Sequence, residues 1–258
     1  MVDISSGTAV ETYANFSIGN IFERSFAILG RNLVPLLVLG GIAAIPYLLI
    51  YYFQGDSAFI QPAAKPAFTV TTAILFFVSL LAAFLLRPIC QAMILFGAFQ
   101  DMRGRRFPIG ESFQKGLARF FPVIGMLFVE GFGILLGFIL LIIPGYMLYM
   151  AWYVALPVCV VERLGPIGSL RRSAALTKGH RWKIFGILFV MSIVAGIVGA
   201  VIGGVVVVSH NKMIYVVGQY LFQAIYTAFQ AVVGVVIYHD LRAAKEGIDT
   251  ERIAAVFD

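Results

Sequence analysis

The stretch from residue 184 to residue 209 constrains this chain most, because it contains no charged side chain. A helix needs about 20 apolar residues to cross the hydrocarbon core of a bilayer, which is roughly 30 Å thick. The whole chain has the same character, since 60% of its residues are hydrophobic and 12% are charged, whereas soluble domains have about 25% charged residues. We therefore expect an all-α, polytopic membrane protein, and 258 residues suffice for one helix bundle.

A short phrase recurs three times, each time before a long apolar stretch. Its copies begin at Ser17, Pro108 and Pro166; each continues with Ile-Gly and ends with a basic residue followed by a small one. Apolar residues in each copy fall on one helical face, as in helices that lie at a membrane interface. A repeat of this kind sets the architecture, so we expect three units, each an amphipathic helix on the cytoplasmic side followed by a transmembrane hairpin. The alternative is chance, because Ile-Gly is a common dipeptide.

The apolar segments predict six transmembrane helices. They cover residues 33–53, 69–100, 120–142, 146–161, 183–208 and 212–239. Short connections at Pro144 and Gly145 and at His210 and Asn211 make the helices that they join antiparallel neighbours. Pro157 is expected to bend or end the fourth span.

Basic residues are distributed unequally between the two sides of these spans. With the N-terminus inside, sixteen of the 19 lysine and arginine residues fall in inner segments, whereas Lys65 and Lys212 fall outside. By the positive-inside rule both termini lie in the cytoplasm, and we expect no signal peptide before the first span. The expected organisation is a disordered tail (residues 1–16), a six-helix membrane domain (residues 17–240) and a cytoplasmic tail (residues 241–258).

Polar side chains within the spans are the first candidates for a site, because each is costly in hydrocarbon. Arg87 and Glu130 are expected at similar depths of neighbouring spans, so we expect them to pair. The candidate polar cavity comprises Arg87, Gln91, Glu130, Gln219, Gln223, Tyr226 and Gln230, of which the last four share one helical face. The alternative is that these groups only hydrogen-bond between helices.

The segment between the fourth and fifth spans is more basic than topology requires. Its basic residues form a candidate surface for anionic lipid or a protein partner: Arg163, Arg171, Arg172, Lys178, Arg181 and Lys183. Such clusters bind acidic headgroups, although a plain topology signal is the alternative. Glu162 and Arg172 are expected to form a structural pair. Because the basic residues lie at membrane edges, the net charge of +6 is not an argument for nucleic acid.

The sequence contains no catalytic or metal-binding motif. His180, His210 and His239 lie on separate segments without zinc spacing, and H-E-x-x-H, G-x-S-x-G and P-loop sequences are missing. Cys90 and Cys159 lie in apolar stretches and are expected to be small core residues. We therefore expect a non-catalytic protein that has neither a metal nor another cofactor.

Three stretches together resemble a known family. They read I-P-G at residues 143–145 with P-V-C-V-V-E at 157–162, S-L-R-R-S at 169–173 with L-T-K-G at 176–179, and Y-H-D-L-R at 238–242 with K-E-G-I-D at 245–249. This pattern resembles the membrane domain associated with bacterial glycerophosphoryl diester phosphodiesterases and its stand-alone inner-membrane relatives. The soluble barrel that performs the phosphodiester chemistry is missing from this sequence, so the resemblance implies no catalytic residue. It implies a place in the bacterial inner (cytoplasmic) membrane and a role near phospholipid metabolism.

Two functions fit these features best. The first is a non-catalytic inner-membrane protein that binds or organises phospholipid, or docks a partner at the cytoplasmic face. The second is a transporter or channel for a small polar or headgroup-like solute, which would pass through the polar cavity. A membrane chaperone or assembly factor is a third possibility.

Reporter fusions test the predicted orientation. Fusions at Ser57 or Asn211 are expected to report the outer compartment, and fusions after Gly110, Ser169 or Asp258 the cytoplasm, because basic residues are retained on the inner side. The measurement is the activity of a reporter that works in one compartment only. A cytoplasmic signal at Ser57 would overturn the topology.

Overall fold

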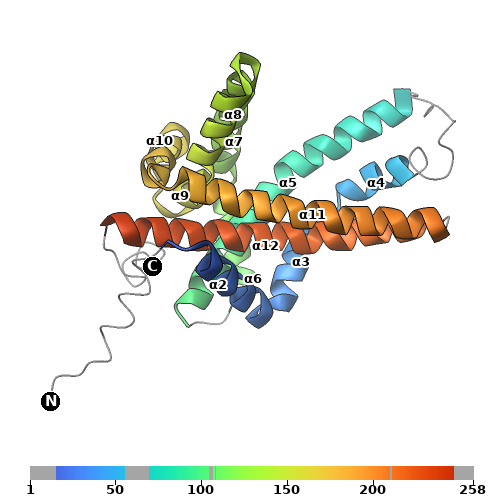
Figure 1. The fold of residues 1–258 in the computed structure, drawn as a ribbon, viewed down its shortest axis with the longest axis horizontal. Coiled ribbons are helices and arrows are strands. Elements are labelled where there is room, and N and C mark those ends of the chain that lie inside the picture. The colour runs from blue at the N-terminus through green and yellow to red at the C-terminus, as the bar shows by residue number, and fades with distance from the viewer. Residues whose placement is uncertain (1–15, 56–69, 105–106, 108, 210, 247–258) are drawn as a thin grey trace.

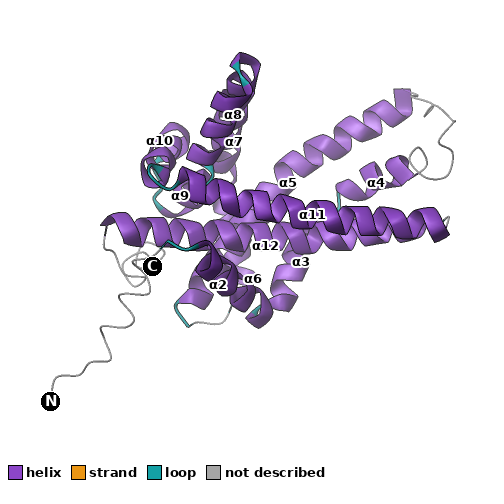
Figure 2. Cartoon of the chain, in the orientation of Figure 1, coloured by secondary structure: helices purple, strands orange, loops and turns teal. Residues whose placement is uncertain are grey.

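The computed structural model describes residues 16–55, 70–104, 107, 109–209 and 211–246 (Figure 1). Within these residues every regular element is a helix and no strand occurs, as Figure 2 shows, so the all-α prediction is confirmed. The helices are α2 (Ile18–Arg31), α3 (Leu33–Ala44), α4 (Tyr47–Gly55), α5 (Val70–Met102), α6 (Ile109–Ala118), α7 (Phe120–Leu140), α8 (Ile142–Trp152), α9 (Ala155–Val161), α10 (Gly165–Thr177), α11 (Arg181–Ser209) and α12 (Lys212–Glu246).

A short helix followed by two longer apolar segments recurs along the chain. The short helices α2 and α6 begin within the first two copies of the repeated phrase, and α10 begins one residue before the third. The apolar segments that follow them are α3–α4 with α5, α7 with α8–α9, and α11 with α12. In Figure 1 these pairs spread as three arms from a common base, the α7–α8 arm pointing away from the long α11–α12 arm.

Within the described residues, five segments are long and apolar enough to cross a membrane: Ala73–Met102, Phe120–Leu140, Ile142–Val161, Arg181–Ser209 and Met213–Glu246. A sixth candidate is the pair of α2 and α3, which is bent by 96°. The first predicted span, residues 33–53, is divided at Ile45 and Pro46 into α3 and α4. Pro46 has no N–H to continue the hydrogen bonding of α3. The fold is that of a multi-pass membrane protein.

The connection between α7 and α8 differs from the prediction. It consists of Leu141, which is extended (φ −166°), whereas Pro144 and Gly145 lie in the first turn of α8. Proline is tolerated there because the first N–H groups of a helix have no helical acceptor. Gly145 permits close packing on α7 instead: a Cβ on Gly137 would lie 3.0 Å from the Gly145 Cα.

A break between α8 and α9 interrupts the fourth predicted span, and it precedes Pro157, which lies inside α9. Two hydroxyl groups of α10 bond to the Ala151 carbonyl beside this break. Ser173 donates to it at 2.9 Å and Thr177 at 3.1 Å, and both side chains are fully buried. A buried carbonyl without a partner costs about 1–3 kcal/mol. The two bonds therefore hold α10 against the break.

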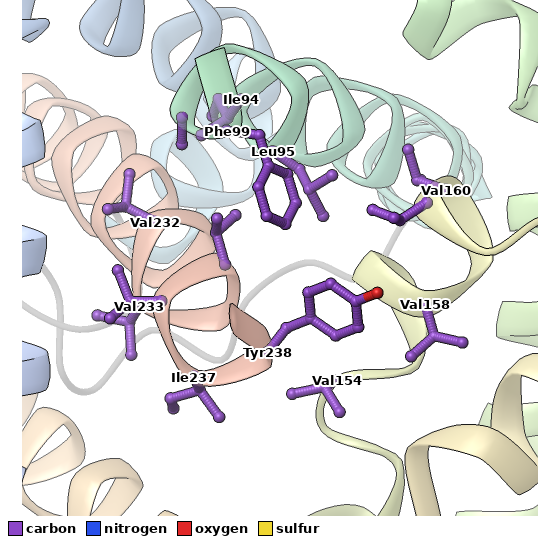
Figure 3. Close-up of a cluster of buried hydrophobic side chains, with 14 of the residues drawn as sticks. Ile94, Leu95, Phe99, Val154, Val158, Val160, Val232, Val233, Ile237 and Tyr238 are labelled. Atoms are coloured by element: carbon purple, nitrogen blue, oxygen red, sulfur yellow. The ribbon is translucent and has the colours of Figure 1, made fainter. Parts of the chain in front are cut away.

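The main apolar core lies at the base, where α5, α9 and α12 meet (Figure 3). Val158 from α9 and Ile237 from α12 are fully buried there. The rings of Phe99 and Tyr238 meet edge to face with their centroids 5.9 Å apart. Such a pair contributes about 0.5–1.5 kcal/mol beyond the area that it buries. The long helices are thus joined at the base, and α3 and α4 also pack along α12 farther from it.

The arms, in contrast, expose large apolar side chains. Ile139 and Leu140 at the end of α7 and Val208 at the end of α11 are at least 70% exposed. In water a surface of this kind would promote association. In a bilayer it faces lipid chains, which agrees with membrane-spanning helices.

The basic residue near the end of each repeated phrase is tied to the base. Arg24 forms an ion pair with Asp240 at 2.5 Å. Lys115 lies above the ring of Phe96, with its Nζ 5.8 Å from the ring centroid. Arg172 pairs with carboxylates described below. The repeated basic residue thus has the same task in three units, with different partners.

The small residue after each of these basic residues is buried. Ser25 and Ser173 are fully buried, and Gly116 packs so closely on α5 that a Cβ would lie 2.6 Å from Cγ of Met93. A larger side chain at these positions would push the short helix away from the base. Close packing therefore explains this part of the phrase.

The C-terminal boundary predicted at residue 240 falls inside a helix. α12 continues to Glu246, and Leu241 is fully buried. Residues 1–15 and 247–258 of the predicted tails lie outside the described residues.

Replacing Gly40 of α3 with alanine is expected to destabilise the fold. A Cβ there would lie 2.2 Å from the Ala224 carbonyl oxygen of α12, so the two helices must separate. Overpacking of this kind costs about 1–3 kcal/mol, which thermal unfolding of the purified protein measures. Gly199→Ala in α11 is the matched control, because its Cβ meets nothing within 4 Å. Equal stability of the two variants would contradict the close α3–α12 contact.

Candidate functional site

A cavity of about 810 Å³ lies between α5, α7, the α8–α9 segment and α12. Its volume is in the range of small-molecule sites, about 300–1,000 Å³. Apolar side chains form most of the walls, among them Phe77, Leu81 and Phe84 of α5 and Phe128 of α7. Pro88 also lines the cavity; it has no N–H to donate to the Phe84 carbonyl, which lies one turn earlier in α5.

The polar part of the cavity contains four of the seven residues expected from the sequence: Arg87, Gln91, Glu130 and Gln230. Arg87 and Gln91 come from α5, Glu130 from α7 and Gln230 from α12. The Nη2 of Arg87 donates a hydrogen bond of 2.6 Å to Oε1 of Gln230. The structure thus brings together side chains that are up to 143 positions apart in the chain.

The expected ion pair between Arg87 and Glu130 is not formed. The guanidinium group bonds to Gln230 instead, and within the described part of the chain no group donates a hydrogen bond to the Glu130 carboxylate. Tyr149, which also lines the cavity, lies within electrostatic reach of both charges. The cavity therefore holds a guanidinium group and a carboxyl group that retain hydrogen-bonding capacity.

The other three expected residues lie elsewhere on α12. Gln223 accepts a hydrogen bond from Tyr51 of α4 at 3.4 Å and donates one to Thr227 at 3.3 Å. Gln219 and Tyr226 are half-buried and, like Gln223, are not among the described residues that line the cavity. Since α12 also packs against α3, α4 and α11, its polar residues face more than one neighbour. For Gln223, contact between helices is the observed role.

Tyr153 lines the cavity but was not expected from the sequence. Its hydroxyl is buried and has no hydrogen-bond partner among the described residues. Buried hydroxyl groups normally find a partner. The signal in the sequence that could have identified Tyr153 is its place inside an apolar span, next to Trp152 and near Pro157. This signal points to the cavity only when the break between α8 and α9, in which Tyr153 lies, is known.

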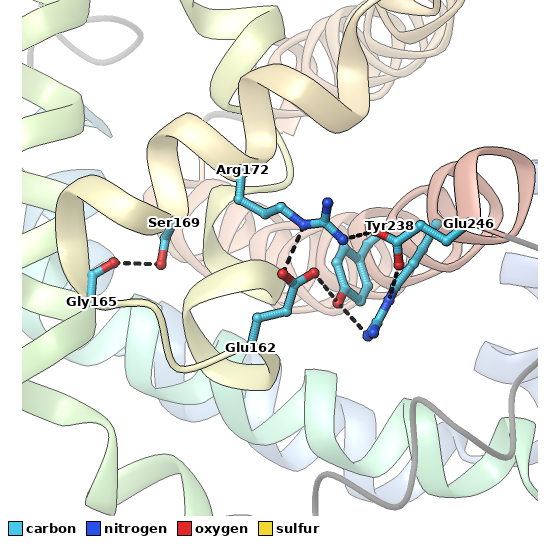
Figure 4. Close-up of polar contacts among 7 residues, drawn as sticks. Glu162, Gly165, Ser169, Arg172, Tyr238 and Glu246 are labelled. Atoms are coloured by element: carbon cyan, nitrogen blue, oxygen red, sulfur yellow. Dashed lines mark hydrogen bonds and ion pairs between the residues drawn. The ribbon is translucent and has the colours of Figure 1, made fainter. Parts of the chain in front are cut away.

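A second polar cluster, the base network, links α9, α10 and α12 (Figure 4). Arg172 donates to Glu162 at 2.8 Å and also pairs with Glu246. The Tyr238 hydroxyl donates to Glu162 at 2.9 Å and accepts a hydrogen bond from Arg242 at 3.2 Å. Arg242 in turn bonds to Glu246 at 3.0 Å. The Glu162–Arg172 contact expected from the sequence is thus part of a larger network.

The basic residues of the candidate lipid surface divide into two groups. Arg163, Arg171 and Lys178 are exposed. Arg163 also adopts a left-handed backbone conformation (φ 57°) in the turn before α10. Arg172, in contrast, is committed to the base network. Its role is structural, whereas the exposed residues are free to face headgroups.

The remaining basic residues surround the start of α11. Lys183 is exposed, and its Nζ donates to the Phe16 carbonyl at 2.9 Å. The Nε of Arg181 is buried and has no partner in the described part of the chain. Burial, together with the charges of Lys183 and Lys245, lowers the pKa of His180. This histidine is therefore more often neutral than an ordinary surface histidine.

In the part of the chain that the structure describes, thiol and carboxylate groups do not gather in a way that could hold a metal. Cys90 and Cys159 are buried free thiols. Over the described ranges, no three His, Cys, Asp or Glu side chains lie together as a metal site requires.

The helices and the cavity define a multi-pass helical membrane protein with a largely apolar pocket between its arms that contains charged residues. The chain belongs to the family described as Domain of unknown function (DUF7847), whose model matches residues 108–241, more than half of its length. The match begins at the second copy of the repeated phrase and ends within α12, so it contains the base network except for Arg242 and Glu246. No curated protein and no solved structure matches the chain.

Replacing Glu162 and Arg172 with glutamine tests the base network by a double-mutant cycle. Each single change is expected to lower the free energy of unfolding by about 1–3 kcal/mol, because it leaves a partly buried charge with fewer partners. The double variant should lose less than the sum, since neighbouring residues couple by about 0.5–3 kcal/mol. Glu111→Gln on the exposed side of α6 is the control. Additive losses would show that the two residues do not interact.

Proposed function

We propose that this protein is a six-span inner-membrane protein with both termini in the cytoplasm, and that it binds phospholipid without catalysing a reaction. The observation that carries the proposal is the cavity, which has charged groups in one part and apolar walls in another. An amphiphilic ligand needs charged groups to bind its headgroup and apolar walls to contact its acyl chains. The resemblance to a membrane domain associated with glycerophosphoryl diester phosphodiesterases agrees with a role near phospholipids.

The position of the charged residues along α5 supports an amphiphilic ligand. Arg87 lies fifteen residues before Met102, the inner end of α5, which corresponds to about 22 Å of helix. Phe77 lies ten residues farther out, and it is 66% exposed although it lines the cavity. Phe128 of α7, another lining residue, is 62% exposed. The cavity is therefore open along an apolar edge that lipid chains can follow.

The short helices support a place at the cytoplasmic interface. In α6, Phe113 and Leu117 are more than half exposed, whereas Ser112 is buried on the opposite side. An apolar face that is not used in the protein core suits the boundary between headgroups and acyl chains. The exposed basic residues Arg171 of α10 and Lys178 at the end of this helix then face acidic headgroups or a protein partner.

A transporter for a small polar solute is the second candidate. It is favoured by one observation: Arg87 and Glu130 share a cavity without pairing. Unpaired charges within a membrane protein commonly mark a solute path. If the protein is a transporter of this kind, the apolar edge of the cavity has no role in binding the solute.

Filling the cavity tests the proposed function. Gly234 of α12 lines the cavity, and a Cβ there meets nothing within 4 Å. Gly234→Leu is expected to lower the phospholipid retained through purification about tenfold, which corresponds to about 1.4 kcal/mol. Mass spectrometry of the extracted lipid measures this. Gly199→Leu is the control, because its Cβ also meets open space but lies on α11, outside the cavity.

The same pair of variants separates the two candidates. Lipid loss in Gly234→Leu alone supports lipid binding. Unchanged lipid in both variants, together with a solute flux across proteoliposomes that Gly234→Leu abolishes, would establish the transporter instead.

A further inference from the structure

The two charges in the cavity differ in sign and are held apart. Arg87 uses one guanidinium N–H for Gln230, so most of its five donors stay available. Glu130 accepts no hydrogen bond within the described residues, and it lies on a different helix from Arg87. A ligand with a single negative charge would satisfy Arg87 and leave the carboxylate unpaired. A ligand with both charges would satisfy both residues.

Groups near Glu130 favour an ammonium that carries N–H donors. Tyr149 lies within electrostatic reach of Glu130 and lines the cavity, so its hydroxyl adds a hydrogen-bond acceptor near the carboxylate. Tyr149 and Trp152 line the same part of the site and supply aromatic rings. A cation over an aromatic face gains about 0.5–2 kcal/mol. Carboxylate, hydroxyl and rings together match a primary ammonium.

From this complementarity we propose that the cavity binds a phospholipid whose headgroup joins a phosphate to a primary ammonium, as in phosphatidylethanolamine. The phosphate contacts Arg87, because guanidinium groups bind phosphate oxygens in pairs. The ammonium contacts Glu130 and the Tyr149 hydroxyl. This inference rests on the proposed function and names the lipid class.

The apolar walls decide between a lipid and a free headgroup. Phe77 and Leu81 of α5 and Phe128 of α7 line the cavity and are exposed along its edge. A water-soluble phosphoethanolamine would leave these walls without apolar contacts. Acyl chains cover them, and the headgroup then lies toward the inner end of α5. This is the orientation of a lipid in the cytoplasmic leaflet.

Binding of defined lipids to the purified full chain in detergent tests the proposal. The ligands are phosphatidylethanolamine, phosphatidylglycerol, phosphatidylcholine and the water-soluble glycerophosphoethanolamine, and native mass spectrometry measures the apparent Kd of each. Phosphatidylethanolamine is expected to bind about tenfold more tightly than either other lipid, and glycerophosphoethanolamine not to compete with it. Glu130→Gln should reduce this preference to within about twofold. Glu111→Gln, an exposed carboxylate on α6, should leave it unchanged.

Tyr149→Phe provides a second test that does not depend on charge. Its hydroxyl has no hydrogen-bond partner among the described residues, so its removal should not lower the unfolding temperature. It should, however, weaken phosphatidylethanolamine binding about threefold to fivefold, the effect of one lost hydrogen bond.

The outcomes separate this inference from the function on which it rests. Equal binding of the three lipids, or a preference that survives Glu130→Gln, overturns the headgroup assignment and leaves phospholipid binding in place. If glycerophosphoethanolamine binds as tightly as phosphatidylethanolamine, the ligand of the cavity is a water-soluble solute and not a lipid. A protein that binds none of the lipids overturns both proposals.

Discussion

The contact of Tyr238 with α5 and α9 is the interaction on which the rest of the structure depends. The ring packs against Phe99 in the apolar core, while the hydroxyl bonds to Glu162 and Arg242. One side chain therefore joins the core to the base network. Because the helices are held together at this end, they can diverge elsewhere, and the divergence of the α7–α8 arm from α5 and α12 leaves space for the cavity.

The membrane class and the helix order could be predicted from the sequence, because both depend on local features. Apolar length identifies a span, and the repeated phrase marks the three short helices. The contact between Glu162 and Arg172 at the base could also be predicted, because only ten residues separate them in the sequence. Errors occurred where local rules compete. Pro144 was expected in a connection, yet the first turn of a helix tolerates proline equally well.

The cavity could be predicted only in part, because its shape depends on the angles between arms. Gln223 and Gln230 share a face of α12 in the sequence pattern, yet one bonds to Tyr51 of α4 and the other to Arg87. A long helix contacts different neighbouring helices along its length. The helical periodicity of the sequence shows which face a residue lies on, but not which helix packs against that face. For the same reason Arg87 and Glu130 were correctly expected near one another but wrongly expected to pair.

The placement of the base contacts late in the chain has a consequence for biosynthesis. Asp240 and Glu246, which pair with Arg24 and Arg172, lie in the last helix and leave the ribosome after the first two hairpins. The first unit is therefore synthesised before Asp240, the residue that fastens Arg24 to the base, exists. Translation of the last turns of α12 therefore completes the ion pairs of the base, and a chain that ends before Asp240 lacks the carboxylates that pair with Arg24 and, in addition to Glu162, with Arg172.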